Sequence, residues 1–460
     1  MYDYQLIVVG AGPGGYVAAL RAAKLGRSVA VIERRETGGT CLNRGCVPTK
    51  TLLHSSQVYH EMVTGANAGI TAQSVQVDMG AIFAHKRQVS RQLSEGIEGM
   101  FQKAGITLIS GRALVSAPHT VQVTDSGEIR TVTAEDILIA TGSVPVRPPI
   151  PGLDLPGVMT SDELLEGSDK LYESIAIIGG GVIGTEFATF YSDLGCEVTI
   201  LEGLPRLLPT LDRELGQNLG QILKRRGVQV LTKATVDRVE QADHRLVVHY
   251  TDKKGIGSVT AEKVLCAIGR RPNLDGLFST DFTPAQTEGR IQVDERFQTS
   301  LPNVYAIGDV SAKIQLAHMA SAQGTAFADL LCGVESVVDL NVVPSCIYTR
   351  PEIAVVGLSE QEAKEAGISA QVGKSVLFGN ARTVIVDGDR CLMKVVARTD
   401  SREVIGAQLM CQNATDMISE LAQAVSNRLT VEQLMHTMRP HPTFAEALGD
   451  ALENLAEKLG

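Results

Sequence analysis

The chain has 460 residues, 44% of them hydrophobic and 20% charged, and its formal net charge is −10. This length exceeds one ordinary domain core and predicts about three domains, and the composition is that of a globular protein. The acidic balance and the lack of a long basic run exclude nucleic acid and membrane surfaces as expected partners, and no apolar stretch has membrane-spanning length. No targeting segment precedes the first strand pattern, which predicts a cytoplasmic protein.

The first predicted element is an apolar strand over residues 4–9 that runs into a glycine-rich turn. Gly10, Gly12 and Gly15 form a G-x-G-x-x-G pattern, and a helix and a second strand ending at Glu33 follow. Glycines at these positions let the backbone turn tightly and approach a pyrophosphate at the helix N-terminus, while the acid reaches a ribose hydroxyl. This segment therefore predicts a dinucleotide-binding unit.

Cys41 and Cys46 come next and are the most informative residues of the chain. On a regular helix, residues five apart lie about 8–9 Å from each other, whereas a disulfide needs Cα atoms within about 7 Å. A bond between them requires a distorted backbone, for which Gly39, Gly45 and Pro48 are suited. Strained or exposed disulfides are easily reduced. A redox-active pair is favoured over two unrelated buried thiols or half of a metal site, because no second close Cys/His pair completes a zinc site.

A long helix is predicted over residues 79–104. Its apolar residues recur at helical spacing and are assigned to core or interface packing: Ile82, Val89, Leu93, Ile97 and Met100. A strand over residues 137–140 then closes the unit with the turn Thr141-Gly142, which we count as part of the cofactor site. No metal site is predicted.

The same arrangement recurs at an offset of 169 residues. Identical residue types pair, in order, from Gly10, Gly12, Gly15, Leu25, Gly26 and Glu33 to Gly179, Gly181, Gly184, Leu194, Gly195 and Glu202. Six matches without a gap, in the same strand–turn–helix–strand setting, predict a second dinucleotide-binding unit. This copy closes with a strand and the turn at Gly269.

The two units are expected to bind different cofactors. The first copy is longer because it contains the cysteine segment, so the dithiol belongs beside the redox group of its ligand. A flavin exchanges electrons with both a dithiol and a nicotinamide, which assigns FAD to the first site and a nicotinamide to the second. Glu202 favours NAD, since a carboxylate repels the extra phosphate of NADP. Arg206 is near enough in sequence to keep NADP open.

Near the C-terminus, His441 and Glu446 form a candidate acid–base pair. An imidazole suits proton transfer between thiols at neutral pH, and a carboxylate five residues on can orient it. A His-Pro step is also common in loops, and the nearby His436 is an alternative.

Together these motifs resemble the flavin-dependent pyridine nucleotide–disulfide oxidoreductases, nearly from end to end, and most of all the branch that oxidises dihydrolipoyl groups. The segment ending at Asp309 resembles the second flavin motif of that family, which implies that Asp309 accepts a hydrogen bond from a ribityl hydroxyl. Without the resemblance, Asp309 is an ordinary turn residue. The resemblance also implies that Ala317 and its neighbours lie against the isoalloxazine, and that Lys50 and Glu186 pair beside flavin N5.

The resemblance further implies an α/β fold with two Rossmann-like dinucleotide-binding domains and a C-terminal α+β dimerisation domain. The expected domains are an FAD-binding domain (1–147, completed by 271–341), an NAD-binding domain (148–270), a central domain (271–341) and an interface domain (342–460). His441 and Glu446 are then the base and its partner, supplied across a homodimer interface. The implied partner is a lipoyl-bearing protein of a 2-oxo-acid dehydrogenase complex or of the glycine cleavage system.

Three alternatives are weaker. Glutathione-type reductases are expected to have basic residues in place of Glu202 and a tyrosine in place of Val182, and mercuric reductases a cysteine pair after Cys411. A non-catalytic flavoprotein docking subunit needs neither the cysteine pair nor the histidine pair. Departures from the commonest dihydrolipoyl pattern leave the choice of acceptor open; they are Val47, Thr49, Arg439, Pro440 and Ala445.

Overall fold

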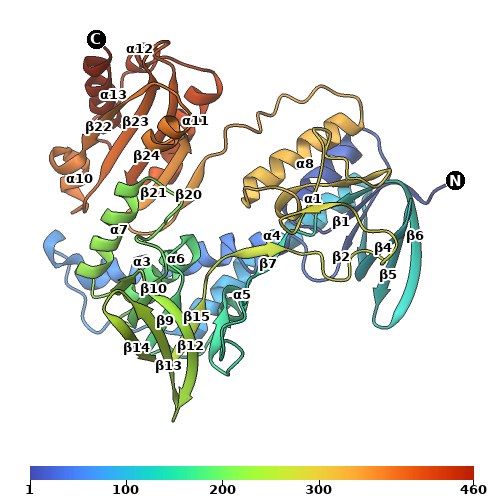
Figure 1. The fold of residues 1–460 in the computed structure, drawn as a ribbon, viewed down its shortest axis with the longest axis horizontal. Helices are drawn as coiled ribbons and strands as arrows, with labels where there is room; N and C mark the ends of the chain where they lie inside the picture. The colour runs from blue at the N-terminus through green and yellow to red at the C-terminus, as the bar shows by residue number, and fades with distance from the viewer.

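The computed structural model describes all 460 residues as three sheet-and-helix units (Figure 1). The first unit contains the N-terminus, the second follows it in sequence, and the third ends at the C-terminus. No helix in the structure combines the length and apolar character needed to cross a membrane.

The first unit is built on a parallel sheet with strand order β3-β2-β1-β6, extended by an antiparallel meander through β5 and β4 and by β19 beside β6. Its strands are β1 (Tyr4–Val9), β2 (Val29–Glu33), β3 (Thr107–Ser110), β4 (Arg112–Ala117), β5 (Thr120–Asp125), β6 (Glu128–Ile139) and β19 (Val304–Ala306). Its helices are α1 (Pro13–Lys24), α2 (Gly39–Asn43), α3 (Cys46–Thr64), η1 (Gly65–Ala68), α4 (Met79–Ala104), η2 (Gly308–Val310) and α8 (Ala317–Leu331). The last four residues of β1, Leu6 to Val9, are buried and apolar, as expected for a parallel strand covered on both faces.

The second unit repeats this arrangement, with strand order β11-β10-β9-β15-β8. Its strands are β8 (Val158–Thr160), β9 (Ser174–Ile178), β10 (Glu197–Glu202), β11 (Gln229–Thr232) and β15 (Lys263–Cys266), with a separate meander β12 (Thr235–Ala242), β13 (Arg245–Asp252) and β14 (Gly255–Ala261). Its helices are α5 (Ser161–Glu166), α6 (Val182–Asp193) and α7 (Arg213–Arg225). Two short ribbons complete this part of the chain: β7 (Ser143–Pro145) with β16 (Arg270–Pro272), and β17 (Gln286–Thr287) with β18 (Arg290–Ile291).

The third unit is an antiparallel sheet with strand order β20-β21-β24-β23-β22. Its strands are β20 (Ser345–Ile347), β21 (Glu352–Gly357), β22 (Ala370–Val376), β23 (Leu392–Arg398) and β24 (Val404–Cys411). Its helices are α9 (Glu360–Glu365), η3 (Leu377–Gly379), α10 (Ala381–Ile385), α11 (Ala414–Ser426), α12 (Val431–Met435) and α13 (Glu446–Leu459). The predicted fold class is confirmed, because two doubly wound sheets precede a C-terminal α+β unit.

The largest apolar core cluster crosses the boundaries between the units. It joins Leu52 of α3 and Leu219 of α7 to Leu392 and Met410 of the C-terminal sheet. Helix α3 also packs against α6 (Figure 1). The redox segment at the start of α3 is therefore held by all three units.

Helix α4 has the predicted bounds, but its buried face differs from the predicted stripe. Leu93 and Met100 are 42% and 43% exposed in the single chain, so they lie outside its core, and their packing in an interface stays a prediction. Buried polar residues share the inner face with Phe83, Ile97 and other apolar residues. Two of them have carbonyl partners: Lys86 Nζ donates to Leu165 O at 2.8 Å, and Ser94 Oγ donates to the carbonyl of a loop residue.

Candidate active site

The two cysteines lie on either side of a break between two helices. Cys41 is on α2, Cys46 is the first residue of α3, and the backbone leaves helical geometry at Arg44 and Gly45. The interruption is the distortion expected from the sequence. At the other end of α2, Gly39 has φ +58°, and a Cβ there would lie 2.7 Å from Gly12 Cα. This close packing sets the cysteine segment directly on the first glycine turn.

The two thiols have opposite acidities. A hydrogen bond from Cys41 and the positive charge of Lys50 lower the pKa of the Cys46 thiol to about 7. The same hydrogen bond, together with burial, raises the pKa of the Cys41 thiol. Cys46 is exposed and Cys41 is half-buried. Cys46 is therefore the better thiolate and the better leaving group of the pair.

An ion pair stands one helical turn after Cys46. Lys50 Nζ lies 2.9 Å from both carboxylate oxygens of Glu186, which projects from α6. The Glu186 side chain is only 4% exposed, so its charge needs this partner. The structure thus brings together two residues that are 136 positions apart in the sequence.

The first glycine turn has the geometry expected of a dinucleotide loop. Gly10 has φ +106°, and a Cβ there would lie 2.4 Å from the carbonyl oxygen of Ala140. A Cβ at Gly15 would lie 1.9 Å from Gly10 O. A Cβ at Gly12 meets no protein atom closer than 4.0 Å. No contact within the protein therefore requires glycine at position 12. The free space beside it fits the approach of a pyrophosphate.

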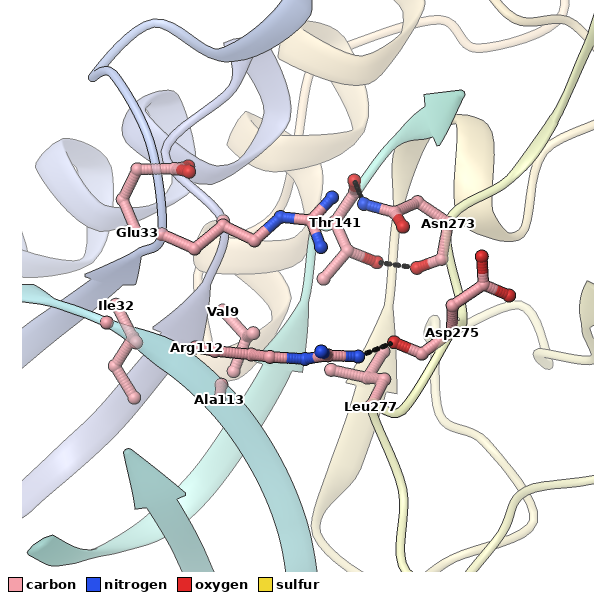
Figure 2. A pocket seen from close by; sticks show the side chains of 12 residues that line it. Val9, Ile32, Glu33, Arg112, Ala113, Thr141, Asn273, Asp275 and Leu277 are labelled. Atoms are coloured by element: carbon pink, nitrogen blue, oxygen red, sulfur yellow. Dashed lines mark hydrogen bonds between the residues drawn. The ribbon is translucent and has the colours of Figure 1, made fainter. Parts of the chain in front are cut away.

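Glu33 ends β2 with both carboxylate oxygens engaged by backbone amides. Ala11 N donates to Oε2 at 2.8 Å and Arg35 N donates to Oε1 at 2.9 Å. Glu33 lines a pocket together with Thr141, which closes β6 ahead of Gly142. On the far wall Thr141 Oγ1 donates to Asn273 O at 2.9 Å, as Figure 2 shows. An acid, a glycine turn and a pocket between them fit the adenosine half of a dinucleotide.

The second copy repeats these contacts atom for atom. Glu202 accepts from Gly180 N at 2.6 Å and from Leu204 N at 2.7 Å. A Cβ at Gly179 would lie 2.5 Å from a carbonyl oxygen, one at Gly184 would lie 2.0 Å from Gly179 O, and one at Gly181 would meet nothing within 4 Å. The closing glycines Gly142 and Gly269 both have positive φ, +68° and +135°.

Arg206, the residue that kept NADP open, is turned into the protein. Its Nη2 donates to Pro209 O at 2.8 Å and to Leu211 O at 3.3 Å. The guanidinium therefore holds the loop after Glu202 in place, and Glu202 is the charged group at the end of β10.

Asp309 lies in the one-turn helix η2 and accepts from Ser143 Oγ at 2.5 Å. Burial raises the pKa of this carboxyl. Arg270 Nε donates to the same hydroxyl at 2.8 Å, and Ala317 begins α8. Ser143 and Arg270 were not predicted. The available signal was their position, because each directly follows the glycine that closes one copy.

His441 and Glu446 form the predicted contact, with Nδ1 2.8 Å from Oε1. The amide of Thr443 and the imidazole hold the pKa of Glu446 below its usual range. The His441 side chain is 72% exposed and makes no hydrogen bond to either cysteine of its own chain. The alternative, His436, is the C-cap of α12 and has no carboxylate partner.

Arg439 replaces a histidine of the commonest pattern, and its charge points inward. Nη2 donates to Glu420 Oε1 at 2.7 Å, Nη1 donates to Thr437 O at 3.2 Å, and the side chain is 9% exposed. Arg439 therefore anchors the loop that contains His441, and it places no positive charge on the exposed side of that loop.

Two dinucleotide-type sites with a dithiol packed against the first define a nucleotide-dependent disulfide oxidoreductase. Residues 4–324 match the family described as "Pyridine nucleotide-disulphide oxidoreductase", and residues 343–452 match its dimerisation domain. The chain belongs to the pyridine nucleotide–disulphide oxidoreductases.

Similar proteins cover the chain almost completely. Dihydrolipoyl dehydrogenase of Geobacillus stearothermophilus is 35% identical over 98% of this chain and 96% of its own length. The mitochondrial dihydrolipoyl dehydrogenase of Pisum sativum is 36% identical over 98% of this chain and 91% of its own. The Cu(II) complex of the HOCl-induced flavoprotein disulfide reductase RclA from Escherichia coli has a TM-score of 0.88 at 30% identity, covering 98% and 99% of the two chains. LpdA from Mycobacterium tuberculosis has a TM-score of 0.90 at 27% identity, with the same coverage.

Membership of this family establishes the general chemistry. The protein is a flavoprotein disulfide oxidoreductase of a family that binds FAD and a pyridine nucleotide, and Cys41 and Cys46 are its redox pair. The dimerisation domain supports a homodimer.

Proposed function

We propose that this enzyme oxidises protein-bound dihydrolipoyl groups to lipoyl disulfide and reduces NAD. The observation that carries the proposal is the exposed His441–Glu446 pair, in a chain that also has an acidic thiol at Cys46. An exposed imidazole with an oriented Nδ1 suits proton transfer to and from a dithiol substrate. Identity of 35% to dihydrolipoyl dehydrogenases adds support.

In the proposed reaction His441 takes the proton of one dihydrolipoyl thiol. The resulting thiolate attacks Cys41 Sγ, the Cys41–Cys46 bond breaks, and Cys46 leaves as a thiolate. The second lipoyl thiol then attacks the mixed disulfide and displaces Cys41, which releases lipoyl disulfide. Two electrons from the substrate now reside on the enzyme dithiol, and the two protons are held by His441 and Cys41.

The residues present fit the family's cofactors. Glu33 and the turn at Gly12 would hold the adenosine and pyrophosphate of FAD, and Asp309 with Ala317 would face its ribityl and ring end. When bound, FAD supplies a two-electron acceptor that accepts from the dithiol and reduces NAD. Lys50, paired with Glu186, keeps its positive charge one turn from Cys46, where the ammonium favours the thiolate and the carboxylate opposes it.

NAD rather than NADP is the proposed nucleotide. Glu202 presents a carboxylate at the ribose position, and Arg206 is committed to carbonyls of its own loop. A 2′-phosphate would meet the negative charge of Glu202, while Arg206 Nη2 is directed at carbonyls of its own loop. The turns at Gly179, Gly181, Gly184 and Gly269 would accommodate the pyrophosphate and the nicotinamide half.

The remaining proposals concern assembly. His441 of each chain would serve the cysteines of the other subunit, because it contacts neither thiol of its own chain. The donor of dihydrolipoyl groups would be a lipoyl-bearing protein of a 2-oxo-acid dehydrogenase complex or of the glycine cleavage system.

The domain division at residues 147, 270 and 341 and the cytoplasmic location also stand as proposals.

Steady-state kinetics of the purified holoenzyme test the substrate. Dihydrolipoamide, glutathione disulfide, Hg(II) and Cu(II) are compared, each with NAD(H) and with NADP(H). Cu(II) is included because the structure of RclA is a copper complex. We expect kcat/KM for dihydrolipoamide with NAD to exceed every other combination by at least about 100-fold, or ~2.7 kcal/mol of transition-state stabilisation. A higher value for any other substrate contradicts the proposal.

A further inference from the structure

The turn between β20 and β21 of the C-terminal unit is fixed along one face of α6. Tyr348 N donates to Glu186 Oε1 at 2.9 Å. The Arg350 guanidinium pairs with Asp193, which lies about two helical turns further along α6. Arg226 Nη1 donates to Arg350 O at 2.9 Å. Contacts to α6 at both ends of the turn hold the tyrosine in one place.

The ring of Tyr348 faces the ammonium group of Lys50. Lys50 Nζ lies 4.6 Å from the ring centroid, within the range in which an aromatic face attracts a cation. Lys50 also donates to both oxygens of Glu186. The ammonium is thus held between a carboxylate from the second unit and an aromatic ring from the third. Although burial opposes its charge, the Glu186 carboxylate raises the pKa of Lys50.

Lys50 in turn acts on the redox pair. It follows Cys46 by four residues on α3, so the two side chains share a helix face. Its charge favours the Cys46 thiolate, whereas the charge of the Glu186 carboxylate opposes it. A group that holds the Lys50 ammonium in place therefore also sets the electrostatic stabilisation of the Cys46 thiolate.

We propose that Tyr348 is a positioning residue for the redox pair: its ring holds the Lys50 ammonium on the helix face that it shares with Cys46 and thereby favours ionisation of Cys46. The C-terminal unit, beyond providing a dimerisation domain, then adjusts the leaving group of the dithiol within its own chain. This inference rests on the proposed function only in taking Lys50 and Glu186 to act on the dithiol, and it does not depend on the lipoyl substrate.

The test compares Tyr348→Leu, which removes the ring, with Tyr348→Phe, which keeps it. The two-electron-reduced holoenzyme is alkylated with iodoacetamide between pH 5 and 9, and Cys46 modification is followed by peptide mass spectrometry. We expect Tyr348→Leu to raise the pH midpoint by about 0.5 to 1 unit, since a freed ammonium stabilises the thiolate less. Tyr348→Phe is expected to stay within about 0.2 units of the parent, because the face of the ring is retained.

Two further variants make the result decisive. Tyr2→Leu is the matched control, since Tyr2 is a partly exposed tyrosine stacked on His119. Lys50→Met removes the charge, so adding Tyr348→Leu to Lys50→Met should produce no further shift. An unchanged midpoint in Tyr348→Leu, an equal shift in Tyr348→Phe, or additive shifts in the double variant would overturn the inference. If the lipoyl proposal fails, the failure would appear in the substrate kinetics, and the pH dependence of Cys46 alkylation would still test the role of Tyr348.

Discussion

The two dinucleotide units share the contacts around their glycine turns and differ in what is inserted between their strands. In both, a glutamate at the end of the second strand accepts one amide from the glycine turn and one from two residues further on. In both, the first and third glycines are required by contacts of about the same length within the protein.

The difference lies between the second and third strands of each copy. The second unit joins β10 to β11 with the single helix α7, whereas the first joins β2 to β3 through α2, α3 and α4. That insertion contains Cys41, Cys46 and Lys50. The comparison separates a repeated part, to which we assign nucleotide binding, from an insertion that contains the redox pair and is contacted by residues of the other units.

Removing either redox sulfur should have the largest effect. Cys41→Ser or Cys46→Ser is expected to lower dihydrolipoamide turnover at least about 1,000-fold, because the covalent route is lost. FAD content and NADH binding should remain at parent levels, because the repeated contacts are untouched. Cys332→Ser is the matched control and should keep parent turnover. Parent rates in either active-site variant would remove the central role of the pair.

Variants of the His441–Glu446 pair test whether the C-terminal unit also contributes a catalytic group. His441→Gln should lower kcat by about 100- to 10,000-fold at neutral pH, the usual contribution of a general base. Mixed dimers of Cys46→Ser chains with His441→Gln chains then reveal the arrangement. If the base acts across the interface, these dimers recover one intact site and about half of the parent activity. Inactive mixed dimers would show that each chain uses its own histidine.

Alanine at the first glycine of each copy should separate the two cofactors. Gly179→Ala is expected to weaken NAD binding at least about tenfold, equivalent to ~1.4 kcal/mol, because its Cβ would lie 2.5 Å from the carbonyl oxygen of Ala267. FAD content should not change. Gly10→Ala should instead lower FAD content. Gly195→Ala is the control for backbone strain alone, because Gly195 has positive φ and open space around it. An equal loss of NAD binding in Gly195→Ala would mean that the collision of the Cβ with Ala267 O is not the cause.

Charge at the end of β10 should set the nucleotide preference. Glu202→Gln is expected to lower the NAD over NADP ratio of kcat/KM by about five- to tenfold, as the repulsion of a 2′-phosphate is removed. Only one of the two amides, Gly180 N or Leu204 N, would keep an acceptor in the glutamine oxygen, because each now donates to a different oxygen of Glu202. Glu197→Gln, at the exposed start of the same strand, is the control. An unchanged ratio would mean that Glu202 does not discriminate between the two nucleotides.

The smallest expected effect is a difference in alkylation between Cys46 of the first unit and Cys196 of the second. In the reduced enzyme the pKa of Cys46 is about 7, whereas burial raises the pKa of Cys196 in the second unit to about 12. Alkylation of Cys46 should therefore be half-maximal near pH 7, fall about tenfold per unit below it and level off above it, since the thiolate is the reactive form. Cys196 should stay unmodified throughout. Equal labelling of both thiols at pH 7 would contradict the assignment.

Local patterns in the sequence predicted much of the fold and the centre of the site. The glycine turns, the strands at residues 4–9 and 137–140 and the helix over 79–104 follow from periodicity and from turn chemistry that neighbouring residues determine. The cysteine pair was recognised for the same reason, since its spacing and glycines lie within one short segment.

Contacts between distant residues could not be read from local patterns. Ser143 and Arg270 meet across 127 positions, and although each follows the closing glycine of one copy, the sequence does not show that the two side chains touch. Arg439, one of the departures that left the choice of acceptor open, is held inside by Glu420, which lies 19 positions away. Leu93 and Met100 fit a helical stripe, yet buried polar groups with carbonyl partners share the inner face of α4 with other apolar residues. In each case tertiary packing decided where a locally plausible side chain points.

The apolar cluster that joins α3, α7 and the C-terminal sheet makes the three units one cooperative structure. Separating the last unit would expose side chains such as Leu219 and Met410 to water on both fragments. Calorimetry of the holoenzyme should therefore show a single melting event rather than successive ones, and a chain truncated before β20 should aggregate rather than persist as a trimmed flavoprotein.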